Sequence, residues 1–195
     1  PLASAGGTDI FVLELDADGK HLWSTRFGGA LDDSLVSLAV TATGHPVIAL
    51  TSSNTELDLG GGPLTGSTDQ NLYAVELDAS GKHVWSRAYA GAIDVAQIAV
   101  APDGDLVLAA SFYTADLGAA GKLVSAGSND VLLARLGPMG EPIWAKRYGS
   151  VWGDLAQRVT VGADGAIYLA VRYSRSSSFG GKPLPDSKGE FSIGV

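Results

Sequence analysis

Short apolar runs separated by glycine-containing turns follow one another along the whole chain. Runs such as 47–50 (VIAL) and 106–109 (LVLA) are apolar at consecutive positions. Val, Ile and Leu at consecutive positions indicate β-strands whose sheets are covered on both faces. No stretch spaces its apolar residues as an amphipathic helix does. The pattern therefore predicts an all-β protein made of short strands.

The strands belong to a repeat of about sixty residues, since three tryptophans lie 62 and 59 positions apart. In each copy another aromatic residue stands four positions after the tryptophan: Trp23 and Phe27, Trp85 and Tyr89, Trp144 and Tyr148. Side chains alternate along a strand, so residues four apart lie on the same face. We expect these pairs to be buried between neighbouring sheets and to hold them together.

Each copy contains four apolar runs joined by turns such as 16–19 (DADG) and 78–81 (DASG), which read as two hairpins. Four-stranded antiparallel sheets repeated at a fixed period are the blades of a β-propeller. In this register the chain holds three complete blades and the first strand of a fourth, all in one domain. The blades with their connections span 1–62, 63–121 and 122–182, and the fourth begins at 183–195. Because both ends fall inside a repeat unit, we expect a partial propeller that belongs to a longer array; the alternative is that copies associate to complete a ring.

The first copy contains a recurring set of short motifs: 8–12 (TDIFV), 15–19 (LDADG), Trp23 and 27–29 (FGG), with the hairpin that follows. This combination resembles the SBBP-type bacterial β-propeller repeat. The resemblance covers nearly the whole chain. It implies a propeller found in large exported or cell-surface bacterial proteins, with a scaffold or interaction role and no catalytic motif. A weaker resemblance, to quinoprotein-type propellers, rests on 18–23 (DGKHLW) and implies only the way in which successive blades dock.

Charge and composition exclude several classes of function. The formal net charge is −8 and no segment clusters Lys and Arg, which disfavours binding to nucleic acid or to anionic membranes. The chain has no Cys, so disulfides, thiolate metal sites and a Cys nucleophile are out. No apolar run approaches the roughly 18 to 20 residues that span a bilayer. We expect no catalytic residue, no metal ligand and no cofactor.

Some Asp and His residues recur at equivalent positions of the copies, which suggests metal or acid–base sites, although a structural role explains the same residues. Asp33, Asp94 and Asp154 stand at equivalent strand entrances and could form a ring of carboxylates around one rim. We favour a role in shaping turns, because an Asp at such a position accepts backbone N–H groups. His21 and His83 also recur, but stacked sheets lie about 10 Å apart, too far for two imidazoles to share a zinc ion, so we expect solvated turn residues.

Trp152 is the one tryptophan outside the repeat, in the loop 149–154 (GSVWGD). An exposed aromatic beside Asp154 suits sugar stacking or contact with a partner, although local packing explains it too. The stretch 172–178 (RYSRSSS) could bind an anion or be a solvated loop. Together these observations predict a non-enzymatic module that binds an unknown protein or glycan, and the resemblance to the SBBP-type repeat implies that this module is extracytoplasmic. A structural spacer in a surface protein and a lectin-like propeller are the alternatives.

Overall fold

The computed structural model describes residues 3–67, 70–188 and 191–194, and within these ranges it is an all-β protein without an α-helix. A first hairpin forms a two-stranded sheet from β1 (Ile10–Leu15) and β2 (His21–Phe27). Two sheets have four antiparallel strands each. In order, their strands are β3 (Asp33–Val40), β4 (Pro46–Ser52), β7 (Asn71–Leu77) and β8 (His83–Tyr89), then β9 (Ile93–Val100), β10 (Leu106–Phe112), β13 (Asp130–Leu136) and β14 (Pro142–Tyr148).

A three-stranded sheet of β15 (Asp154–Val161), β16 (Ile167–Ser174) and β17 (Phe191–Gly194) follows at the C-terminal end. The middle connection of each complete sheet is itself a small hairpin. These hairpins are β5 (Glu56–Asp58) with β6 (Pro63–Thr65), and β11 (Thr114–Asp116) with β12 (Lys122–Val124), the latter closed by the short 3₁₀ turn η1 (Gly118–Ala120). The all-β prediction is confirmed.

The strands of one sequence copy do not form one sheet. Each complete sheet joins the second hairpin of one copy to the first hairpin of the next, so the sheet 33–89 extends across the expected boundary at 62/63. The expected grouping is therefore wrong: the described residues hold two complete sheets, flanked by a two-stranded and a three-stranded one, and not three complete sheets. A repeating sequence has no natural starting point, and only the hydrogen-bonded pairing reveals where a sheet begins.

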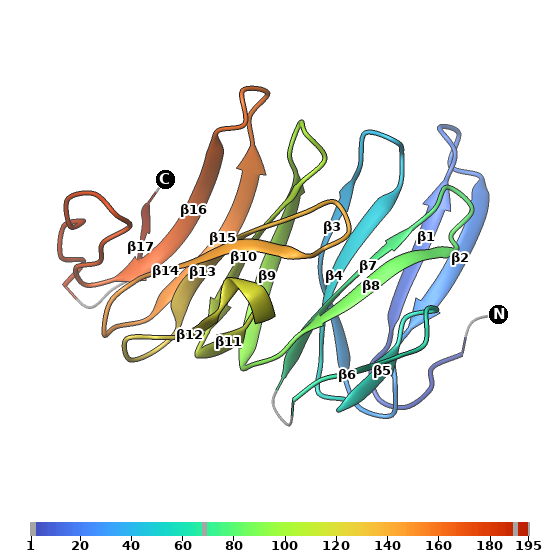
Figure 1. Ribbon diagram of the computed structural model, residues 1–195, viewed down its shortest axis with the longest axis horizontal. Coiled ribbons are helices and arrows are strands. Elements are labelled where there is room, and N and C mark those ends of the chain that lie inside the picture. Colours follow the sequence, from blue (N-terminus) through green and yellow to red (C-terminus); the bar gives the residue numbers. More distant parts are fainter. Residues whose placement is uncertain (1–2, 68–69, 189–190, 195) are drawn as a thin grey trace.

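The sheets stand in a row in sequence order (Figure 1). The strands β3, β9 and β15 form one edge of their sheets and lie next to one another, whereas β8 and β14 form the opposite edge. The first and last sheets lie at opposite ends of this row, so the described residues do not close into a ring.

Three apolar cores fill the spaces between successive sheets. Along β7 the alternate residues Tyr73 and Val75 face the β1–β2 hairpin, while Leu72 and Ala74 face the sheet that follows. Every residue of β4 and β10 is buried, which confirms that consecutive apolar positions mark strands covered on both faces.

Candidate functional site

The loop between β14 and β15 presents Trp152 at the surface. Its side chain is 45% exposed, and the neighbouring Val151 is 61% exposed. The backbone N–H of Trp152 donates to Ser150 Oγ at 3.1 Å, and the Val151 carbonyl accepts from the backbone N–H of Ser128 at 3.4 Å. The loop is thus held from both sides while its two apolar side chains face the solvent.

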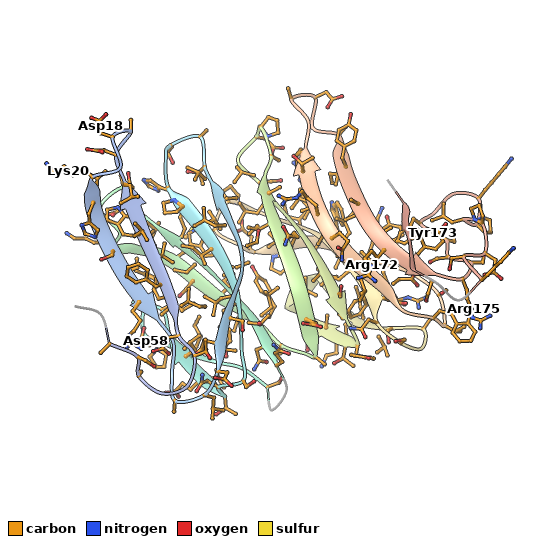
Figure 2. The ribbon with its side chains drawn as sticks, turned by 180° about the vertical axis from the view of Figure 1, so that it is seen from behind. Asp18, Lys20, Asp58, Arg172, Tyr173 and Arg175 are labelled. Carbon is orange, nitrogen blue, oxygen red and sulfur yellow. The ribbon has the colours of Figure 1, made fainter. Side chains whose placement is uncertain are left out.

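Arg175, which directly follows β16, stacks on this tryptophan. The guanidinium carbon lies 4.2 Å from the centre of the Trp152 ring, the geometry of a cation–π contact. Arg175 has a left-handed backbone (φ 57°), and its N–H donates to Ser187 Oγ at 2.6 Å. The sequence suggested Trp152 and the stretch 172–178 as separate features, and the folded chain brings them together. Figure 2 shows Arg172, Tyr173 and Arg175 near one another at the same end of the molecule.

Asp154 lies beneath this loop and is fully buried. Its Oδ2 accepts the backbone N–H of Ser150 at 2.8 Å and the Ser150 hydroxyl at 3.2 Å. Burial raises the pKa of Asp154, although the hydrogen bonds from Ser150 oppose that shift. Asp154 therefore shapes the loop, as an Asp at a strand entrance is expected to do, and it contributes no surface beside Trp152.

The chain passes from one sheet to the next through the segments 28–32, 90–92 and 149–153, here called the crossings. Beside the first and the third crossing lies an ion pair that the sequence analysis missed. Arg147 donates to the buried Asp130 at 2.9 Å, and in the first copy Arg26 donates to Asp9 at 3.0 Å. The second copy has neutral residues at both positions of this pair, Asn71 and Ala88, as the common strand registers show. Each copy therefore has either both the aspartate and the arginine of this ion pair or neutral residues at both positions. A comparison of the paired positions across the copies could have found this.

The expected equivalence of Asp33, Asp94 and Asp154 is wrong. The equivalent strands β3, β9 and β15 begin at Asp33, Ile93 and Asp154. The second copy therefore has an isoleucine at the position where the other two copies have an aspartate. Asp94 stands one residue further along and is exposed. Because neighbouring side chains in a strand point to opposite faces, the three carboxylates cannot form one ring.

A close approach explains the glycines of the charged crossings. Gly28 (φ 151°) and Gly149 (φ 142°) lie against the carboxylates of Asp9 and Asp130, where a β-carbon would collide with a carboxylate oxygen. Within the described ranges, no group of three or more His, Asp or Glu side chains is placed to hold a metal ion.

The repeat tryptophans dock one sheet onto the next. Trp85 is 6% exposed, and its indole N–H donates to Glu76 Oε2 at 2.6 Å. Its ring covers Gly140 in the β13–β14 turn, where an added β-carbon would stand 2.7 Å from the ring. The Tyr89 hydroxyl donates to the Gly140 carbonyl at 2.7 Å, and burial raises the pKa of this hydroxyl. Two aromatic side chains of the preceding sheet thus contact Gly140 in the turn of the sheet that follows.

The first joint between sheets repeats part of this arrangement. Trp23 donates its indole N–H to Glu14 Oε2 at 2.5 Å, and its ring lies 2.6 Å from the β-carbon position of Gly81 in the β7–β8 turn. Phe27 is buried in the core between the same two sheets. A Trp over a turn glycine is therefore the shared element of both joints.

The third aromatic pair is only half buried. Trp144 has the ammonium of Lys146 at 5.3 Å from its ring centre, and Tyr148 stacks on Phe179 with ring centres 6.1 Å apart. The residue paired with Trp144 across the strands is Arg135, where the other copies have glutamate. Arg135 instead forms ion pairs with Asp103 and Asp105.

The histidines have separate environments. His21 is exposed, as expected of a turn residue, whereas His83 is half buried, packs against Gly61 and lies 3.0 Å from Ser86 Oγ. The sequence analysis did not single out His45, whose Nδ1 lies 2.7 Å from Glu76 Oε1. None of these contacts brings two imidazoles together.

Comparison with known proteins does not assign the chain: no family model matches it, and neither does any curated protein. The resemblance to the SBBP-type repeat therefore stays a prediction. Over the described residues, no helix has the length and apolar character needed to cross a membrane.

Proposed function

We propose that this chain is part of a β-propeller that serves as a non-enzymatic, protein-binding scaffold in an exported or cell-surface bacterial protein. Antiparallel four-stranded sheets at a period of about sixty residues, stacked with their first strands side by side, support the propeller interpretation. The bacterial and extracytoplasmic parts of the proposal rest on the resemblance of the repeat words alone.

The exposed pair of Trp152 and Arg175 carries the binding part of the proposal. Tryptophan and arginine are the residues most enriched at the energetic centres of protein interfaces. Here the two are already stacked, so little side-chain freedom remains to be lost on binding. Arg175 covers one face of the indole, which leaves less open ring for a sugar and adds a donor for carboxylates. These features favour an acidic or aromatic peptide segment over a glycan.

A peptide library displayed on phage and selected on the immobilised chain tests this proposal. We expect the selected peptides to lose at least ten-fold in affinity for Trp152→Ala and for Arg175→Ala. Tyr168→Ala is the matched control, because Tyr168 is also a large exposed aromatic (55%) but stands near the start of β16, at the opposite end of this strand from Arg175. Near-ultraviolet circular dichroism would establish that all variants are folded.

The alternatives give different results in the same experiments. A glycan-array signal that disappears with Trp152→Ala would replace the scaffold with a lectin. Peptides that bind all variants equally, or a selection that enriches nothing, would favour a structural spacer and refute the proposal.

A further inference from the structure

The small β11–β12 hairpin carries two exposed apolar side chains near the third crossing. Tyr113, between β10 and β11, is 48% exposed, and Val124, the last residue of β12, is 65% exposed. The two are close along the hairpin, since Thr114 pairs with Val124 across its strands. With the exposed Val151 and Trp152 of the third crossing, four large apolar side chains face the solvent in this part of the molecule.

Backbone hydrogen bonds hold the hairpin, the third crossing and the end of β16 side by side. Three bonds from an N–H to a carbonyl join neighbouring segments: Ser125 to Tyr113 at 2.9 Å, Ser128 to Val151 at 3.4 Å and Ser174 to Gly153 at 3.1 Å. Hydrogen-bonded segments lie about 4.8 Å apart, and three residues span at most about 11 Å, so Tyr113 and Val151 are no more than about 20 Å apart. These segments form a continuous rim of the molecule, which ends at Arg175.

The repeat forms the same hairpin and the same crossing without these apolar side chains. In the preceding sheet and the first crossing, the residues equivalent to Tyr113, Val124 and Val151 are small or polar: Ser53, Thr65 and Ala30. Packing of the repeat therefore does not explain why large apolar residues gather here. An exposed group of apolar side chains in one place marks an interaction site, whereas single ones do not.

Exposure at this rim does not depend on which sheets follow the loop. Leu31 stands at the position of Trp152 in the first crossing, two residues before the first residue of β3. It is 50% exposed although two complete sheets follow it. The crossing itself therefore directs this side chain to the solvent, and the third copy places an indole there.

The charges of the rim indicate what kind of ligand fits it. Arg175 is the only charged residue in the segments that form this part of the rim, which are 113–115, 124–128, 149–153 and 174–176. The nearby carboxylates of Asp130 and Asp154 are buried. The formal net charge of −8 repels a strongly acidic ligand, but a single carboxylate can pair with Arg175. A mainly apolar ligand with one acidic group therefore matches this surface.

We propose that the binding surface extends from Trp152 and Arg175 along the rim to Tyr113 and Val124, and that it takes an extended peptide segment of a partner protein. A segment of about six to eight residues spans this distance at 3.3 Å per residue. Its apolar side chains contact Tyr113, Val124 and Val151, and its one acidic side chain pairs with Arg175. This inference rests on the proposed protein-binding function and defines the ligand of the same site.

Fluorescence anisotropy with the peptides selected on the immobilised chain tests this extension. The variants Tyr113→Ser and Val124→Thr carry the residues of the preceding sheet, so the fold should tolerate both. We expect each to weaken binding at least about five-fold, as truncation of a residue that contributes binding energy does. Tyr168→Ser and Val84→Thr are the matched controls and should leave the affinity unchanged. Tyr168 and Val84 are also exposed, but they stand near the starts of β16 and β8, at the opposite ends of these strands from the rim.

The outcomes separate this inference from the proposed function. Peptides that lose affinity for Trp152→Ala and Arg175→Ala but bind Tyr113→Ser and Val124→Thr like the wild type would overturn the extended surface and leave the proposed function intact. Peptides that bind every variant equally, or a selection that enriches nothing, would overturn both. Replacing the acidic residue of a selected peptide by its amide should weaken binding to the wild type but not to Arg175→Ala, and an equal loss with both would refute the contact with Arg175.

Discussion

Replacing Gly140 by alanine tests whether a tryptophan over a turn glycine holds the sheets together. Gly140 has a φ of 73°, and its β-carbon position lies 2.7 Å and 2.9 Å from two carbons of the Trp85 ring and 3.0 Å from the Tyr89 hydroxyl. Gly104 offers a matched control in the β9–β10 turn, with a φ of 91° and nothing within 4 Å of its β-carbon position. Both alanines suffer the same backbone strain, and only one collides with its surroundings.

The magnitude follows from how little the ring can move. Trp85 is fixed by its hydrogen bond to Glu76 and by the core around it. A left-handed alanine costs about 1–2 kcal/mol at either site. Overpacking adds about 1–3 kcal/mol at Gly140 alone. For a chain of this length, 1 kcal/mol lowers Tm by about 2–4 °C, so Gly140→Ala should melt roughly 2–12 °C below Gly104→Ala.

Thermal and urea denaturation measure this difference, and a double-mutant cycle identifies its origin. In a Trp85→Ala background the two closest collision partners are absent, so most of the excess cost of Gly140→Ala should disappear, and only the 3.0 Å approach to the Tyr89 hydroxyl remains. Equal stabilities of Gly140→Ala and Gly104→Ala, or an excess cost that persists without Trp85, would refute the joint as the origin of the effect.

Three further predictions concern buried groups at the crossings and joints. Arg147→Ala leaves the buried Asp130 carboxylate without its cation and should cost about 2–3 kcal/mol in urea denaturation, whereas adding Asp130→Asn, which copies the neutral pair of the second repeat, should restore most of it. Burial raises the pKa of Asp154, so the folded chain keeps this carboxyl protonated to a higher pH than the unfolded chain does. The contribution of this group to the free energy of unfolding therefore falls as the pH rises from 3.8 through the raised pKa. The stability of Asp154→Asn relative to wild type should therefore increase between pH 3.5 and 7, and a constant difference would contradict this reasoning. Trp85→Ala should cost about 3–5 kcal/mol, and Trp144→Ala should cost clearly less in the isolated chain, because its ring is only half buried; equal costs would show that the two rings are packed alike.

The sequence predicts the strands well and their grouping poorly. Consecutive apolar residues such as those at 47–50 and 106–109 report local burial, which depends little on which sheet a strand joins. The assignment of hairpins to sheets depends on whether the chain crosses to the next sheet after β2 or after β4. The crossing is the short segment 28–32, and the return is the longer β5–β6 connection. Nothing in the repeat words marks one of these as the boundary.

The candidate site shows the same limit. Trp152 was recognisable because it departs from the repeat, but its partner Arg175 lies 23 residues away and is brought close by the loop after β16. The misplaced Asp94 has a simple cause: the second crossing is two residues shorter than the first and third, since β8 ends at Tyr89 and β9 begins at Ile93. Matching residue types without allowing for that deletion selects the wrong side chain.

The contacts that join the sheets are shared between the copies, whereas the segments that lead from one sheet to the next differ between them. The complete joints share a tryptophan over a turn glycine. The crossings differ, because the second copy replaces the charged pair by Asn71 and Ala88, and a backbone bridge between Ala90 and Asp116 ties this segment down instead. A crossing can therefore be held in more than one way without disturbing the stack. Loops of this kind are free to differ in sequence, which is where a surface such as that of Trp152 can arise.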